Sequence, residues 1–233
     1  VAVVYEPLYK MGGGELHLKY ILDAFPNSEL FTAYYDQEIV EEHFKGIKVH
    51  SSFMQKLPWK DKLRYIYLLL NPLAYKSFNF KNYDVIISLS SHFAKFAHTN
   101  GVPHIDDCMT PPKFLWQKDD RTLKDKKQLS GINRFFFGIY SFFMDTFLER
   151  LWQKWDRNAA RRCTKIIANS NVVKKRIKKF YDLDSDVIYP PVEVSKILEH
   201  PKVNRKENWY LYIGRVERYK GVHLAIKACD RLD

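Results

Sequence analysis

The feature that most constrains the fold is the run YDVIISLSS at residues 83–91, which is almost continuously apolar between turn signals. A strand without alternation of apolar and polar residues is buried on both faces, as in a parallel sheet covered by helices. Further strand-like runs at 1–6, 29–35, 46–52 and 164–170 alternate with helix-patterned stretches. This alternation is typical of crossover connections between parallel strands. We therefore predict an α/β fold with a parallel sheet flanked by helices.

Other patterns complete the expected order of elements. The first strand leads to GGGE at 12–15, after which an amphipathic helix is expected to extend to Phe25. The stretch 103–110 is a weaker strand candidate, and 61–78 and 132–162 have helical patterns. Ser170 is placed to cap the helix that follows the strand at 164–170.

The carboxy-terminal part of the sequence indicates a domain boundary. The run SDVIYPPV at 185–192 ends on a double proline, which is typical of a connector. Residues 193–207 are polar and charged, as in a linker, and NWYLYIG at 208–214 has the pattern of a new strand. We predict a first domain at 1–192, a linker at 193–207, and at 208–233 the first strand, loop and helix of a second, incomplete domain.

The net charge constrains the choice of partners but not the fold. The chain of 233 residues has a formal charge of +11, which favours anionic partners such as phosphorylated substrates or anionic lipid. We do not expect nucleic-acid binding, since the sequence contains no recognised DNA or RNA module. No apolar run is long enough to span a membrane. Three widely spaced cysteines argue against a disulfide framework or a zinc site and favour a reducing, cytoplasmic environment.

The glycine-rich stretch after the first strand is a candidate ligand-binding loop. Gly12, Gly13 and Gly14 allow the backbone to approach a ligand closely, and the following helix offers free N–H groups to an anion. Glu15 also suits the positive end of the helix dipole, so a structural role for it is equally open. The stretch matches neither the dinucleotide-binding nor the P-loop pattern.

A second candidate lies on the strand-to-helix loop near the end of the chain. Arg215 and Lys220 follow the strand pattern that ends at Gly214, and a helix pattern follows them. Two cations beside a helix N-terminus form a cradle for a diphosphate and could neutralise charge on a departing phosphate. The alternative is that both are solvated side chains in a chain with 38 lysines and arginines.

Several motifs, in this order along the chain, resemble glycosyltransferase family 4, whose members are retaining enzymes of the GT-B fold. They are GGGE (12–15), IIANSNVVKKRI (166–177), VIYPPV (187–192) and YIGRVERYKGVHLAIKA (212–228). The similarity covers nearly the whole chain. It looks closest to bacterial mannosyltransferase-like enzymes of surface polysaccharide biosynthesis.

The resemblance implies two Rossmann-like domains, an amino-terminal one for the acceptor and a carboxy-terminal one for a nucleotide-diphosphate sugar. Arg215 and Lys220 match the pair that grips the donor diphosphate and serve catalysis, while Gly13 and Gly14 match the loop at the reaction centre. No metal or other cofactor is expected, because the two cations replace a divalent ion. The expected reaction transfers a hexose, mannose by preference, to a lipid-linked or polysaccharide acceptor at the cytoplasmic membrane face.

Two departures from the family pattern leave an alternative open. CMTP at 108–111 has Met109 before Thr110, where the family has a histidine, and a thioether cannot replace the hydrogen bonds of an imidazole. Lys113 stands where an arginine is usual and lacks its bidentate fork. The family's E-x7-E segment is also missing, so we expect a longer protein to exist. The alternative is a truncated, non-catalytic protein that binds a glycan or a partner.

The helical pattern at 132–162 is unusually aromatic. Phe136, Phe143 and Trp152 are candidates for peripheral contact with an anionic membrane surface, which the basic runs at 124–127 and 174–179 would support. The alternative is a helix buried within the protein, which its periodicity favours for at least one face.

Overall fold

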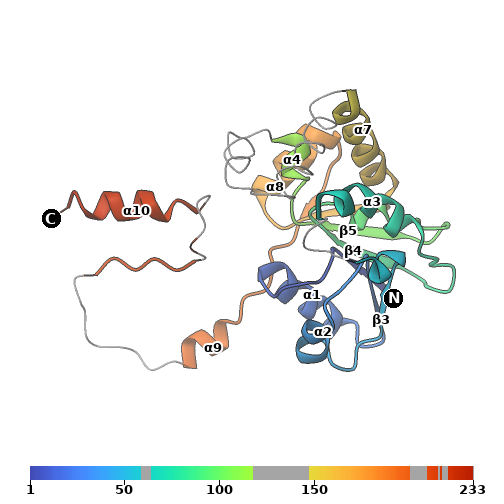
Figure 1. Ribbon diagram of the computed structural model, residues 1–233, viewed down its shortest axis with the longest axis horizontal. Coiled ribbons are helices and arrows are strands. Elements are labelled where there is room, and N and C mark those ends of the chain that lie inside the picture. Colours follow the sequence, from blue (N-terminus) through green and yellow to red (C-terminus); the bar gives the residue numbers. More distant parts are fainter. Residues whose placement is uncertain (59–63, 118–146, 200–208, 215, 217–219, 233) are drawn as a thin grey trace. The chain divides into compact units, whose positions relative to one another are not determined.

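The computed structural model describes residues 1–58, 64–117, 147–199, 209–214, 216 and 220–232 (Figure 1). The chain forms two compact units, Val1–Pro191 and Val192–Asp233. The division predicted from the sequence, with a linker at 193–207, stays a prediction.

The first unit is built on a seven-stranded sheet with the strand order β3-β2-β1-β4-β5-β6-β7. Every pairing within it is parallel, and β1 lies between β2 and β4, with Val3 opposite both Leu30 and Ile87. The predicted α/β fold with a Rossmann-like parallel sheet is therefore confirmed. The strands are β1 (Ala2–Tyr5), β2 (Glu29–Thr32), β3 (Val49–Ser51), β4 (Ile86–Ser90), β5 (His104–Cys108), β6 (Lys165–Ala168) and β7 (Asp186–Val187).

Helices cover both faces of this sheet, as apolar strands require. On one face, α1 and α2 pack over Val3, Tyr5 and Leu89. On the other, α3, η2 and α7 pack over Ala2 and Val4 (Figure 1). The helices of this unit are α1 (Gly13–Ala24), α2 (Gln37–His43), η1 (Phe53–Lys56), α3 (Arg64–Lys76), η2 (Ala94–Phe96), α4 (Lys113–Trp116), α7 (Phe147–Arg162) and α8 (Asn171–Tyr181).

The expected burial of the central strands is observed. All residues of β1 and β4 are buried, which explains the continuous apolar run at 83–91. The predicted cap is also present, since Ser170 Oγ accepts a hydrogen bond from the Val173 amide at the start of α8. The weak strand candidate at 103–110 forms β5, which lies inside the sheet between β4 and β6.

The second unit contains α9 (Val194–Glu199) and α10 (Val222–Cys229). The predicted strand at 208–214 is wrong for the described residues 209–214, which form no strand and expose Trp209, Leu211 and Ile213. A strand requires a neighbouring strand to accept its hydrogen bonds, and the described part of this unit offers none. The helix α9 also occupies part of the stretch expected to be a linker.

Candidate functional site

The order of the strands reverses direction between β1 and β4. From β1 the sheet continues to β2 and β3, and from β4 it continues in the opposite direction to β5, β6 and β7. In open α/β sheets, ligands bind beyond the carboxyl ends of the strands at such a switch point. The segments that leave β1, β4 and β5 at this edge are residues 6–12, 91–93 and 109–112. This edge is therefore the candidate site of the first unit.

Glu6, the residue after β1, fastens two of these segments together. Its Oε1 accepts hydrogen bonds from the amides of residues 91–94, at 3.1, 2.7, 2.9 and 3.2 Å in chain order. The carboxylate thus occupies the N-terminus of η2, where a negative charge is stabilised by converging N–H groups. Glu6 is 8% exposed, so it shapes the floor of the edge.

The predicted glycine loop and the segment after β5 come together at this edge. Gly12 caps α1, and a side chain at Gly14 would place its Cβ 2.7 Å from the Tyr5 hydroxyl and 3.4 Å from Met109 Sδ. Gly13 has open space around its Cβ position. The Tyr5 hydroxyl hydrogen-bonds to Glu15, and burial together with this carboxylate raises the pKa of Tyr5. Only a glycine at 14 allows this close approach.

The other predicted residues of this edge lie along the chain after β5. The Met109 amide donates to the Ser90 carbonyl at 2.8 Å, which keeps Met109 in register with β4. Thr110 Oγ1 accepts from Arg176 Nη1 of α8 at 3.3 Å. Lys113 begins α4 and is exposed. Arg176, which the sequence indicated only as part of the basic run at 174–179, adds a cation to this edge.

A histidine–aspartate pair beside the glycine loop was also missed from the sequence. His17 Nε2, on the second turn of α1, lies 3.2 Å from Asp107 Oδ2, near the end of β5. Burial and the neighbouring Asp106 raise the pKa of Asp107 to about 7, and burial lowers the pKa of His17. Two adjacent aspartates within a strand candidate were the available signal, because strands of this kind seldom contain them.

On the opposite face of the sheet, Asp106 belongs to a buried polar network. Ser88 and Ser90 donate to its two oxygens at 2.6 and 2.9 Å. Burial raises the pKa of Asp106 to about 6. His104 lies 2.8 Å from Ser88 Oγ, and burial lowers its pKa to about 4. These polar groups are enclosed, so they support the sheet and cannot contact a ligand.

Asp156 of α7 forms the second part of that network. Lys95 Nζ lies 2.8 Å from Asp156 Oδ1, and both side chains are buried. Trp116 and Tyr181 donate to Asp156 Oδ2 at 2.7 and 2.8 Å. The network joins η2, α4, α7 and α8 behind the candidate site.

The predicted donor-binding pair belongs to the second unit. Lys220 is exposed and precedes Gly221. Gly221 is the N-cap residue of α10 and has a φ of 73°. This agrees with the expected loop and helix, whereas Arg215 lies outside the described residues. That both residues grip a diphosphate stays a prediction.

Only one of the three candidates for membrane contact lies in the described part of the chain. Phe136 and Phe143 lie outside the described residues. Trp152 is 6% exposed and packs edge-to-face on Phe93 at 5.7 Å, so its assignment to membrane contact is wrong. The apolar face of α7 is occupied by the core of its own unit, as the alternative interpretation held. Within the described residues, no helix is long and apolar enough to cross a membrane.

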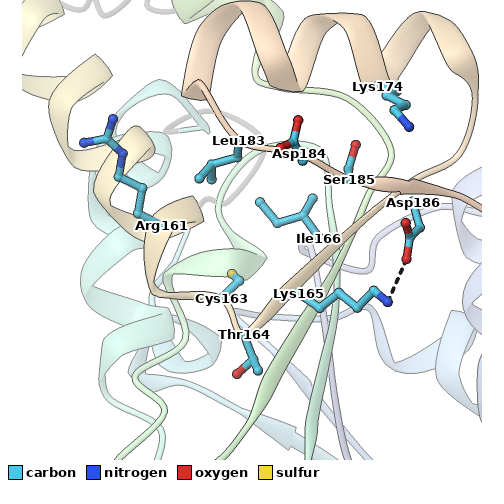
Figure 2. Close-up of a pocket in the computed structure, with 10 residues that line it drawn as sticks. All are labelled: Arg161, Cys163, Thr164, Lys165, Ile166, Lys174, Leu183, Asp184, Ser185 and Asp186. Atoms are coloured by element: carbon cyan, nitrogen blue, oxygen red, sulfur yellow. Dashed lines mark ion pairs between the residues drawn. The ribbon is translucent and has the colours of Figure 1, made fainter.

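A hollow of about 440 Å³ lies at the other edge of the sheet, at the amino ends of β6 and β7 (Figure 2). Its lining includes Lys165 and Asp186, which form an ion pair at 2.6 Å. None of the predicted site residues lines it. Among the residues that the structure describes, no cluster of three histidine, cysteine or acidic side chains could hold a metal ion.

The sheet order and its helices define a Rossmann-like α/β protein with a candidate site at the switch point. No family model matches the sequence, and a search of the curated proteins gives no significant match. Among solved structures, the chain is similar to HepE (Alr3699) of Anabaena, in complex with UDP and glucose. That similarity has a TM-score of 0.44 and 15% identity and covers 83% of this chain and 45% of HepE.

It is also similar to the apo form of WaaB, a lipopolysaccharide outer core galactosyltransferase. The TM-score is 0.41 and the identity 13%, over 82% of this chain and 46% of WaaB. The matched part of the chain thus spans less than half the length of either protein.

Proposed function

We propose that this chain forms the acceptor-side domain, and the start of the donor-side domain, of a retaining glycosyltransferase. It transfers a hexose, mannose by preference, from a nucleotide-diphosphate sugar to a lipid-linked or polysaccharide acceptor. The observation that carries the proposal is the glycine loop at the switch point, where Gly14 packs against Tyr5 and Met109. The order of motifs along the sequence, from GGGE to the loop with Arg215 and Lys220, supports the same assignment.

In this proposal the two units have different chemical tasks. The open space at Gly13 leaves room for a substrate above the loop, while Glu6 and Tyr5 hold the loop's surroundings in place. Arg215 and Lys220 neutralise the diphosphate as it departs, which removes the need for a metal ion. A lipid-linked acceptor would bring the protein to the cytoplasmic membrane face, where basic side chains such as Lys174 and Lys178 of α8 favour anionic headgroups.

Calorimetric titration of the chain with UDP-glucose, UDP-galactose and GDP-mannose tests the proposal. We expect binding of at least one of these donors, and tightest binding of GDP-mannose. Lys220→Ala should weaken that binding at least tenfold, because it removes a charge from the diphosphate contact. Lys227→Ala, an exposed lysine within α10, is the matched control and should bind as the unaltered chain does.

The second candidate is a non-catalytic protein that binds a glycan or a partner, which the thioether of Met109 favours. It predicts that none of the three nucleotide sugars binds. It also predicts that Met109→His, which restores a hydrogen-bonding side chain at this position, produces no sugar transfer to an added acceptor.

A further inference from the structure

Asp107 is a buried carboxylate with unusually few partners. Its Oδ2 faces His17, while Oδ1 is buried and has no hydrogen-bond partner among the described residues. By contrast, Asp106 receives two serine hydroxyls, and Asp156 has an ion pair and two hydrogen bonds. Burying a carboxylate with so little compensation is unfavourable, so its presence calls for a reason other than stability.

The position of the pair supplies that reason. Gly14 and His17 are three residues apart on α1 and therefore lie on one face of the helix. Asp107 and Met109 are two residues apart along an extended segment and point to the same side of the sheet. Since Gly14 lies against Met109 and His17 against Asp107, the pair lies directly beside the contact that forms the candidate site.

The geometry also bears on the state of the imidazole. His17 Nε2 lies 3.2 Å from Asp107 Oδ2, so an ionised Asp107 places its carboxylate opposite the Nε2–H group and the lone pair of the ring lies on Nδ1. Burial lowers the pKa of His17, so the ring remains neutral and Nδ1 remains an acceptor. An aspartate that orients a histidine through one nitrogen and leaves the other for a substrate is a recurring arrangement in active sites.

We propose that His17, held through Nε2 by Asp107, binds a hydroxyl group of the sugar substrate through Nδ1. His17 is then a substrate-binding residue and Asp107 its positioning residue. A sugar hydroxyl fits because it donates one hydrogen bond to a neutral ring nitrogen, and the neighbouring Met109 sulfur is only a weak acceptor. The inference rests on the proposed function and adds a residue that specifies the sugar and not the diphosphate.

Calorimetry with UDP-glucose and with UDP separates these contributions, and GDP-mannose with GDP replaces this pair throughout if the chain binds GDP-mannose but not UDP-glucose. His17→Ala should weaken the binding of UDP-glucose at least tenfold and change that of UDP by less than twofold, because UDP carries no hexose. His17→Gln, whose amide oxygen is also an acceptor, should recover part of the loss. His43→Ala on α2 removes a histidine far along the chain from the glycine loop and should leave both affinities unchanged.

A spectroscopic measurement tests the role of Asp107 independently of binding. In the chain labelled with ¹⁵N-histidine, at about pH 8, where Asp107 with its pKa of about 7 is ionised, the imidazole shifts of His17 should show a protonated Nε2 and an unprotonated Nδ1, and UDP-glucose should shift the Nδ1 signal. Asp107→Ala should abolish the preference for this tautomer. Circular dichroism of each variant verifies that the fold is retained.

Failure of this inference is distinguishable from failure of the proposed function. If the unaltered chain binds none of the nucleotide sugars, the proposed function is wrong and the role of His17 falls with it. If the chain binds UDP-glucose but His17→Ala binds it equally well, or loses UDP to the same degree, only the role of His17 is overturned. An Nδ1 signal that does not respond to bound UDP-glucose would overturn that role as well.

Discussion

Replacing Glu6 tests whether its carboxylate holds the floor of the candidate site. One oxygen of Glu6 accepts four backbone N–H groups of residues 91–94. A hydrogen bond to a charged group contributes about 1.5–3 kcal/mol, but four donors that share one oxygen do not add. Counting two full bonds, we expect Glu6→Ala to reduce the free energy of unfolding by about 4 kcal/mol. Glu6→Gln keeps an acceptor but loses the charge and should lower it by about 2 kcal/mol, since neutral hydrogen bonds are roughly half as strong.

Urea denaturation followed by circular dichroism measures these changes. With a denaturant slope of about 2 kcal/mol per molar urea, the midpoint should fall by about 2 M for Glu6→Ala and about 1 M for Glu6→Gln. Glu42→Ala is the matched control, because its carboxylate is exposed on α2, and such changes stay within about 0.5 kcal/mol. A midpoint for Glu6→Ala within about 0.3 M of the unaltered protein would refute the reasoning.

Three further changes test neighbouring parts of the structure. Gly14→Ala should lower the free energy of unfolding by about 1–3 kcal/mol because its Cβ would lie 2.7 Å from the Tyr5 hydroxyl. In a Tyr5→Phe background, which lacks the hydroxyl and its hydrogen bond to Glu15, the same Gly14→Ala change should cost much less in the urea assay, and an equal cost would contradict the clash. Lys95→Met leaves Asp156 without its counter-ion and should cost about 3–5 kcal/mol, visible as a lower melting temperature. An unchanged melting temperature would show that the buried pair is dispensable. Because burial raises the pKa of Asp107 to about 7, above its unfolded value of about 3.9, the folded state binds this proton more tightly. Its contribution to stability is therefore fully present below about pH 4 and is lost as the pH rises to 7, and Asp107→Asn should flatten the profile between about pH 4 and pH 7.

The strands with uniform apolar patterns were the most predictable part of the fold. Because β4 is buried on both faces, the run at 83–91 that contains it is almost continuously apolar, and this pattern is visible in the sequence alone. The strand β5 gave a weaker signal because His104 and Asp106 are polar. Their partners Ser88 and Ser90 belong to another strand, so no local pattern reveals that these groups are satisfied.

The candidate site could be predicted only in part, for the same physical reason. The glycine loop has a local signature, and Met109 was identified from the motif around it. Glu6, His17 and Asp107 depend on contacts between segments far apart along the chain, which periodicity does not encode. Trp152 shows the opposite case, because an aromatic, amphipathic pattern fits a membrane surface as well as a protein core, and only the tertiary contact with Phe93 decides between them.

The place of β1 in the sheet has a consequence during synthesis of the protein on the ribosome. This strand leaves the exit tunnel before the other six strands of its sheet, and β2 and β3 can join it soon afterwards as a half-sheet with α1 and α2. The other edge of β1 must wait for β4 at Ile86. Until then an apolar strand edge is open to pairing with other nascent chains, so slow translation between β3 and β4 would promote aggregation.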